Sequence, residues 1–251
     1  MQTMKQKLQA GETVFGQMIL ELFTPGIAPM LHNAGLDFVI YDMEHGRCGY
    51  ELLSQMVTSC RGTRLTPIAR VPDVYAHPIA RLLDIGARGV MIPRLDTAEQ
   101  MQDAVAQLKY APSGRRGVAL GLAHDHFHPR GAPYFEEANQ ETVVIAIIET
   151  PKALENLDAI VATPGLDVAW MGHYDLTVSL GIPAQFDHPV FLNAMDSLVA
   201  ACRKHGVAAG FLPANAPDMV HWLSKGFRAI SLGTDAGVYS RGVTEFRKAA
   251  G

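Results

Sequence analysis

Short hydrophobic runs rich in Val, Ile and aromatic residues recur along the chain, and each precedes a longer segment with helical spacing of hydrophobic residues. This order is typical of repeated strand and helix units that build a parallel sheet. Several runs, such as VVIAII at 143–148, are hydrophobic without alternation, as expected of strands buried on both faces. We count eight runs, at residues 14–20, 38–43, 67–71, 89–93, 142–148, 168–172, 207–212 and 229–233. Eight repeats favour an α/β fold of the closed (β/α)8 TIM barrel type over an open sheet.

The segments between the runs carry the signals that start and stop helices. Gly35 follows the first helical segment, Thr97 precedes AEQMQDAVAQL, and Pro151 opens KALENLDAIVA. Residues 111–140 are the exception, because they are rich in Gly, Pro, Arg and His and lack clear periodicity. Such a long excursion in a compact domain is more often functional than idle, so we expect an active-site loop there. No Pro/Gly/Ser-rich linker divides the chain, which predicts a single domain over residues 1–251.

Composition narrows the class of partner. The chain has 251 residues, of which 48% are hydrophobic, so it can bury a large core without disulfides or a structural metal. The net charge of −4 and the isoelectric point near 6.2 argue against nucleic acid or an anionic membrane as the principal partner. A small soluble substrate is the simpler expectation.

Cysteine usage and the absence of long hydrophobic stretches bear on location. Cys48, Cys60 and Cys202 are scattered without metal-binding spacing, and this odd number suggests reduced thiols. The first residues, MQTMKQKLQAGETVFG, lack the hydrophobic run of a signal peptide, and no stretch approaches the ~18 hydrophobic residues of a membrane span. We therefore expect a cytoplasmic protein.

Two carboxylates follow neighbouring predicted strands. Glu149 ends VVIAII and Asp175 follows VAWMGHY, and in a parallel barrel the ends of the strands meet at one mouth. Hard divalent cations bind a few carboxylate oxygens and keep water or substrate oxygens as further ligands. The alternative is that each acid caps a helix or lies in its first turn, where the helix dipole favours negative charge. Position alone leaves both interpretations open.

Three more polar residues are candidates for proton transfer and charge stabilisation. His45 ends the second run as DMEHG and can take a proton near neutral pH, while Arg70 ends the third run and can stabilise a developing oxyanion. Asp84, in RLLDIGA, could orient a histidine and raise its basicity. Taken singly, each has a structural explanation: a hydrogen-bonded histidine, an ion-paired arginine and an acid at a helix end.

Two motifs give weaker signals. His124, His126 and His128 alternate in HDHFH and would share one face of an extended strand, as in a Zn²⁺ site, but the segment lacks a rigid strand to hold them. A solvated or substrate-covering loop is the favoured interpretation. The closing SLGTDAG, at 231–237, has the small residues of barrel phosphate loops, yet tight turns explain its glycines equally well.

Four strings in order across residues 15–240 resemble the HpcH/HpaI aldolase family: GLDFVIYDMEHG, LLDIGARGVMIPRLDTAEQ, IETPKALENLDAI and MGHYDLTVSLGIP. The resemblance implies a class II pyruvate aldolase, in which a divalent metal (Mg²⁺, Mn²⁺ or Co²⁺) assists formation of a pyruvate enolate that adds to an aldehyde. It also implies the reverse cleavage of a 4-hydroxy-2-oxo acid. By the same resemblance Glu149 and Asp175 match the metal ligands, His45 the catalytic base, Arg70 the arginine beside the enolate oxygen, and Asp84 the acid that tunes the histidine.

The strand ends also carry expected substrate-binding residues. Gly172 matches the family's glycine near the pyruvate carboxylate, and we add His173, Tyr174 and Leu212 at the same mouth. Two positions depart from the family. Ile147 stands where many relatives have Gln, and His173-Tyr174 stands where many have Pro-Ala. These changes remove a hydrogen-bonding group and add a large ring, so the usual substrate preference is not assumed.

Other functions remain possible on this scaffold. The alternatives are a lyase of CoA thioesters such as citryl- or malyl-CoA, and a non-catalytic barrel that binds a small molecule. The chain is short for a bulky cofactor, and a mere binder has no use for a base aimed at a metal. The resemblance also implies a homo-oligomer, commonly a hexamer built as a trimer of dimers with helices exchanged between subunits.

Overall fold

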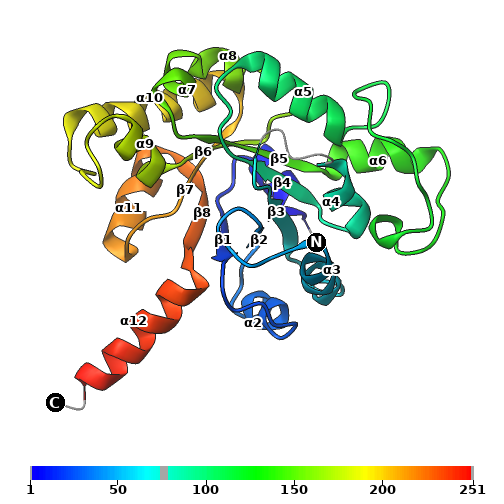
Figure 1. Ribbon diagram of the computed structural model, residues 1–251, viewed down its shortest axis with the longest axis horizontal. Coiled ribbons are helices and arrows are strands. Elements are labelled where there is room, and N and C mark those ends of the chain that lie inside the picture. Colours follow the sequence, from blue (N-terminus) through cyan, green and yellow to red (C-terminus); the bar gives the residue numbers. More distant parts are fainter. Residues whose placement is uncertain (1, 74–78, 250–251) are drawn as a thin grey trace.

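A computed structural model describes residues 2–73 and 79–249 of the protein. Its centre is a closed barrel of eight parallel strands in chain order, with β8 returning to pair with β1 (Figure 1). The strands are β1 (Val14–Ile19), β2 (Phe38–Asp42), β3 (Thr66–Arg70), β4 (Gly89–Ile92), β5 (Val143–Ile148), β6 (Val168–Met171), β7 (Ala208–Phe211) and β8 (Phe227–Thr234). Each strand overlaps one predicted hydrophobic run, so the predicted (β/α)8 barrel is confirmed.

Side chains on the strands alternate between the barrel interior and the layer beneath the helices. On β5, Val143, Ile145 and Ile147 belong to the interior cluster, and on β2 so do Phe38 and Ile40. Because successive residues point to opposite faces, the next inward position on each strand lies where the strand stops. We call this end of the barrel the mouth. Its inward positions include Asp42, Arg70, Glu149, Gly172 and Leu212.

Helices surround the barrel and bury the outer face of the strands (Figure 1). They are α1 (Met4–Gln9), α2 (Ile27–Asn33), α3 (Tyr50–Ser59), α4 (Ala80–Ile85), α5 (Ala98–Leu108), α6 (Pro133–Glu141), α7 (Pro151–Glu155), α8 (Leu157–Val161), α9 (His173–Ser179), α10 (Pro189–His205), α11 (Ala216–Lys225) and α12 (Asp235–Lys248). Thr97 caps α5 in a capping box with Gln100, and Thr150 caps α7 with Pro151 in its first turn, as their sequences predict.

The excursion between α5 and β5 lies at the other end of the barrel. It leaves the C-terminal end of α5 and returns to the first residue of β5, so it belongs to the end where the strands begin. Its contacts agree, because the carbonyl of Ala123 accepts a hydrogen bond from Arg61, just after α3, and Arg116 pairs with Asp84 near the end of α4. Within one chain this segment therefore does not cover the mouth, and the active-site role expected of it stays a prediction.

Helix α6 was not expected from the sequence. Its sequence PYFEEANQE buries only Tyr134 and Ala138, four residues apart, so its hydrophobic stripe is too narrow to stand out as a period. These two residues pack with Tyr110 in a small cluster separate from the main core. The cluster anchors the excursion beneath the barrel.

The last helix, α12, projects away from the barrel (Figure 1). Among the described residues of this helix only Asp235, at its start, is buried, whereas Tyr239 is 66% and Phe246 is 84% exposed. Val238 and Val243 are exposed as well. A helix with this many exposed hydrophobic side chains is unusual in a water-soluble monomer.

The structure also bears on the cysteines and on the length of the hydrophobic helices. Cys48, Cys60 and Cys202 are buried and form no disulfide with one another. Among the described helices, none combines the length and hydrophobicity needed to cross a membrane.

Candidate active site

Glu149 lies at the mouth, directly after β5, and is only 6% exposed. Its Oε1 atom accepts a hydrogen bond of 2.7 Å from the backbone N–H of Arg94, a residue held in the left-handed region at φ 55°. Burial raises the pKa of Glu149 to about 7, and the negative charges of Asp175 and Glu44 add to this effect against the Arg94 hydrogen bond. A buried carboxylate near two others is a site that a cation would stabilise.

The helix-cap interpretation of this acid does not hold. The next residue, Thr150, caps α7 by accepting a hydrogen bond from the backbone of Ala153, which leaves Glu149 without a capping role. Asp175 lies in the first turn of α9 and is exposed. It makes no hydrogen bond or ion pair with another residue in the described part of the chain. Its carboxylate is therefore available to a ligand.

Gly172 separates β6 from α9 and lies against Glu149. A Cβ atom at this position would lie 2.6 Å from the Cβ and 2.7 Å from the Oε2 of Glu149, and 2.8 Å from Cγ2 of Ile147. Only glycine fits in that space. This close approach brings the first turn of α9, with Asp175, beside the carboxylate of Glu149.

Arg70 lies at the end of β3, opposite Asp42 in the register of β2. Its Nε and Nη2 atoms donate to the two oxygens of Asp42 at 2.8 and 2.5 Å, and its Nη1 lies 3.3 Å from Glu44 Oε2. Burial lowers the pKa of Arg70, but the hydrogen bonds and charge of Asp42, with the charges of Glu44 and Glu149, raise it overall. The guanidinium thus stays charged and fixed in direction.

His45 lies in the loop after β2, with 52% of its side chain exposed. Its Nε2 atom lies 3.7 Å from Glu44 Oε2, and Glu44 is nearly buried and also faces Arg70. Burial, together with the negative charge of Asp42, raises the pKa of Glu44 overall, against the opposing positive charges of Arg70, His45 and Arg94. In the single chain the acid beside His45 is therefore Glu44.

Asp84 has a different neighbour from the one that its expected role requires. Its Oδ1 atom accepts a hydrogen bond of 2.6 Å from Nη2 of Arg116, at the end of the barrel opposite the mouth. It does not contact His45, because it lies near the end of α4, opposite the mouth. One chain does not bring these two residues together.

The added rings at the mouth have separate surroundings. His173 packs against Phe186 and Phe211 at centroid distances of 5.4 and 5.2 Å, and burial lowers its pKa to about 4. It is neutral and forms part of the wall. Tyr174 is 60% exposed and meets Phe186 edge-on, while half-buried Leu212 packs against the interior cluster.

Sequence reasoning missed Asp42 and Arg94 as neighbours of these side chains. The signal for Asp42 was present, because it continues the inward alternation of Phe38 and Ile40 on β2. The contribution of Arg94 is a backbone N–H, which no residue type reveals. Within the described residues no three His, Cys, Asp or Glu side chains form a ready-made metal cluster, so the proposed Zn²⁺ site of the HDHFH stretch gains no support.

Known proteins resemble this chain over most of its length. The sequence profile of the HpcH/HpaI aldolase/citrate lyase family matches residues 17–241. The chain belongs to this family. It is 33% identical over 240 residues to a 2-keto-3-deoxy-L-rhamnonate aldolase of Klebsiella pneumoniae, covering 94% of this chain and 88% of that protein. It is 32% identical over 235 residues to a hydroxypyruvate/pyruvate aldolase of Roseobacter denitrificans, with 93% and 91% covered.

Solved structures of HpcH/HpaI proteins share the fold over nearly the whole chain. An HpcH/HpaI aldolase from Desulfitobacterium hafniense superimposes with a TM-score of 0.92 at 32% identity, covering 99% of this chain and 97% of that one. The predicted family, barrel fold and aldolase activity are therefore confirmed. The chain is an enzyme of the lyase type.

Proposed function

We propose that this HpcH/HpaI family member is a divalent-metal-dependent aldolase that forms or cleaves 4-hydroxy-2-oxo acids, with pyruvate or hydroxypyruvate as the 2-oxo acid. The observation that carries the proposal is the environment of Glu149. Its carboxylate is buried, caps no helix, and lies near the unpaired carboxylate of Asp175. Arg70 and the Glu44–His45 pair occupy neighbouring strand ends of the same mouth. The relatives named above act on such substrates.

Glu149 and Asp175 fit a hard divalent cation such as Mg²⁺, Mn²⁺ or Co²⁺. Two carboxylates leave the other coordination positions to water and substrate oxygens, which suits a catalytic site. When bound, the cation would withdraw negative charge from the 2-oxo group. The raised pKa of Glu149 supports this assignment, because a cation is what removes the cost of ionising that buried acid.

The remaining residues act on the substrate directly. Arg70, held by Asp42, has N–H donors left over that can stabilise the oxygen on which charge develops. In cleavage, the ring nitrogen of His45 takes the proton of the 4-hydroxyl group, the C3–C4 bond breaks, and the aldehyde leaves. The electron pair of that bond passes to the 2-oxo group, and a proton is then returned to C3. Aldol addition is the reverse.

The two departures from the family pattern, Ile147 and His173-Tyr174, are proposed to set the specificity for the aldehyde. Ile147 is 3% exposed and presents a methyl group next to Gly172, where it cannot hydrogen-bond a polar substrate. Tyr174 and Leu212 add apolar surface near the mouth. We therefore expect the aldehyde site to favour a partner with an apolar or ring face over a small polar aldehyde.

A homo-oligomer accounts for two features of the single chain. The exposed hydrophobic side chains of α12 need a partner surface, and a second copy of the barrel is the simplest one. The assigned role of Asp84 also needs a second copy, because His45 and Asp84 lie at opposite ends of one barrel. We propose that Asp84 of a neighbouring subunit approaches His45 in a hexamer built as a trimer of dimers.

The compartment follows from the thiols. Three buried cysteines without a disulfide are typical of a reducing compartment, so we propose the cytoplasm.

The direct test is cleavage of a 4-hydroxy-2-oxo acid, followed by coupled detection of the pyruvate released. We expect activity with added Mg²⁺, Mn²⁺ or Co²⁺, none in excess chelator, and recovery when the metal is restored. Full activity in excess chelator would contradict the metal assignment. Cleavage of a malyl-CoA thioester in preference to the free hydroxy-oxo acid would favour the CoA-lyase alternative.

A further inference from the structure

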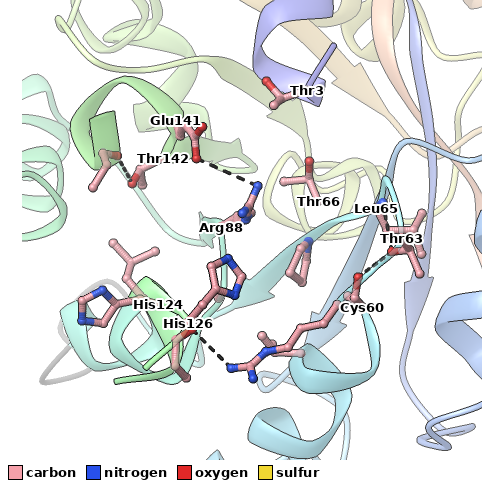
Figure 2. A pocket seen from close by; sticks show the side chains of 18 of the residues that line it. Thr3, Cys60, Thr63, Leu65, Thr66, Arg88, His124, His126, Glu141 and Thr142 are labelled. Carbon is pink, nitrogen blue, oxygen red and sulfur yellow. Dashed lines mark hydrogen bonds and ion pairs between the residues drawn. The ribbon is translucent and has the colours of Figure 1, made fainter. Parts of the chain in front are cut away.

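A cavity of about 420 Å³ lies at the end of the barrel opposite the mouth (Figure 2). Its walls include Leu65, Arg88 and Thr142, which directly precede β3, β4 and β5, together with residues of the excursion 109–142. This volume lies in the range of small-molecule sites. The cavity is lined by none of the residues assigned above to the active site.

The lining of this cavity is cationic, although the whole chain carries a net charge of −4. Five arginines line it: Arg61, Arg64, Arg88, Arg116 and Arg130. Arg116 and Arg130 have carboxylate partners, Asp84 and Glu137, but the ion pair between Arg88 and Glu141 is long, at 3.9 Å. Within the described residues no carboxylate lies in ion-pair range of Arg61 or Arg64. The cavity therefore holds an excess of positive charge.

His126 lines the cavity together with these arginines, and it is exposed to solvent. Figure 2 shows His126 beside Arg88, with Glu141 on the far side of Arg88. Partial burial lowers the pKa of His126, and the positive charges of Arg88, Arg61 and Arg130 lower it further, against a smaller opposite effect of Asp125. Three guanidinium groups are thus close enough to the imidazole of His126 to lower its pKa.

The backbone that presents His126 is strained. His126 and Phe127 both lie in the left-handed region, at φ 58° and 60°, which side-chain-bearing residues rarely adopt in succession. Arg61 fixes this turn from outside, because its guanidinium lies 4.9 Å from the Phe127 ring centroid and donates to the carbonyl of Ala123. Strain of this kind persists where surrounding contacts enforce it, and it concentrates at ligand sites.

The flanking residues hold the turn in place. Asp125 is 1% exposed and accepts a hydrogen bond of 2.6 Å from the backbone N–H of Gly121. The ring nitrogens of His124 lie 2.6 Å from the hydroxyl of Tyr134 and 2.8 Å from the carbonyl of Ala119. His124 is therefore a structural residue, and only His126 of the two faces the cationic groups. The site is built before any ligand arrives.

We propose that this cavity binds a phosphate group, either inorganic phosphate or the phosphate of a small phosphorylated metabolite, through Arg61, Arg88 and His126. A phosphate monoester carries a charge of about −1.5 to −2 at neutral pH and offers several acceptor oxygens. One planar guanidinium group can donate hydrogen bonds to two of these oxygens at once. Glu137 and Glu141 on the same wall repel a second anionic group. A dicarboxylate is thereby disfavoured, and hydroxyl groups are the better complement to those carboxylates.

Calorimetric titration of the metal-free protein in excess chelator tests this proposal without relying on aldolase activity. The ligands are inorganic phosphate, glycerol 3-phosphate and, as the dicarboxylate control, succinate. We expect both phosphate compounds to bind and succinate not to bind, and the tighter of the two phosphates identifies the source. Arg61→Gln and Arg88→Gln should each raise the Kd by about 10-fold or more, as expected for the loss of a charge-assisted hydrogen bond.

Arg115→Gln is the matched control, because Arg115 lies in the same segment but pairs with Asp103 and does not line the cavity. Its Kd should equal that of the wild type. Equal binding of succinate, no heat with either phosphate, or loss of binding in Arg70→Gln but not in Arg61→Gln would overturn the proposal.

A second measurement on the wild-type protein covers the case in which a variant does not fold. The imidazole ¹⁵N signals of His126, assigned by comparison with His126→Asn, should shift on addition of phosphate. His128, which is exposed and does not line the cavity, provides the internal control. Phosphate binding without a change in the His126 signals would overturn the proposal equally.

Discussion

Arg70 is held by Asp42 through two hydrogen bonds of 2.8 and 2.5 Å that join the ends of neighbouring strands. Asp42 is fully buried and also accepts hydrogen bonds from the backbone N–H groups of Glu44 and His45, so the pair is held rigidly. Rigid placement matters because a hydrogen-bond donor stabilises a developing charge best when the donor already points at the atom that becomes charged. The arginine is thus directed by a residue that itself need not touch substrate.

Replacing Arg70 by alanine should lower kcat by about 10²-fold or more, since the main group that stabilises charge on the 2-oxo acid is lost. The Kd for Mn²⁺ should change far less, because Arg70 is not a proposed ligand. Arg115→Ala is the control, because its side chain pairs with Asp103 away from the mouth, and its kcat should equal that of the wild type. An unchanged kcat in Arg70→Ala would remove this residue from the mechanism.

Gly172→Ala should weaken metal binding while the barrel still folds. The new Cβ would overlap the Cβ and Oε2 of Glu149 and push that carboxylate out of place. We expect the Kd for Mn²⁺, measured by electron paramagnetic resonance, to rise by about 10-fold or more, since misplaced ligands cost roughly one to two kcal/mol. Gly117→Ala, where a Cβ meets no atom within 4 Å, is the control. Equal metal affinity in the two variants would show that the close packing has no functional part.

The barrel was predictable from the sequence because its strands are buried on both faces. Uninterrupted runs such as VVIAII leave little choice of element, and β5 was found within one residue of its predicted start. Because chemistry in such barrels gathers at the strand ends, Glu149, Asp175, His45 and Arg70 were predicted as site residues. Their partners were not, because the pairing of Asp42 with Arg70 depends on the register between two strands, which the sequence does not display.

Other features could not be predicted from the sequence, for physical reasons. Helix α6 buries too few residues to show a period, and the composition of the excursion around it does not reveal at which end of the barrel it lies. Asp84 matched a family role, yet its contact in one chain is Arg116. The sequence of α12 does not reveal that this helix projects from the barrel, since the same hydrophobic residues could equally belong to a helix packed on the barrel.

Tyr174→Ala should change the choice of aldehyde and leave the 2-oxo acid step intact. The ring is 60% exposed beside the mouth and touches Phe186, so it offers apolar surface to a substrate but no group to the reaction. We expect KM for an aldehyde with a ring to rise by about 5- to 10-fold, in line with the loss of one aromatic contact. KM for a short hydroxyaldehyde should stay nearly constant. Equal effects on both aldehydes would argue for a structural role.

His173 should make the protein less stable in mild acid. Its pKa is lowered to about 4 in the folded protein and is near 6.5 when unfolded, so between these values the unfolded state binds the extra proton. Stability is therefore lost as the pH falls from 6.5 to 4, by up to about 3 kcal/mol from this residue.

Urea unfolding at several pH values, in chelator, measures that loss. His173→Phe keeps a ring between Phe186 and Phe211 and should flatten the curve between pH 6.5 and 4, whereas His128→Phe, at an exposed position, should leave it as in the wild type. A curve for His173→Phe that is as steep as the wild type would show that other groups cause the acid sensitivity.

The proposed aldolase activity depends on a cation held by Glu149 and Asp175 close enough to His45 and Arg70 for all to act on one 2-oxo acid. Exchange of the methyl protons of pyruvate in D₂O, followed by NMR with and without Mg²⁺, Mn²⁺ or Co²⁺, tests this without knowledge of the aldehyde. We predict metal-dependent exchange in the wild type and in Glu155→Gln, an exposed control, and none above background in Glu149→Gln or Asp175→Asn. Exchange that persists in chelator, or at the wild-type rate in both carboxylate variants, would contradict the account.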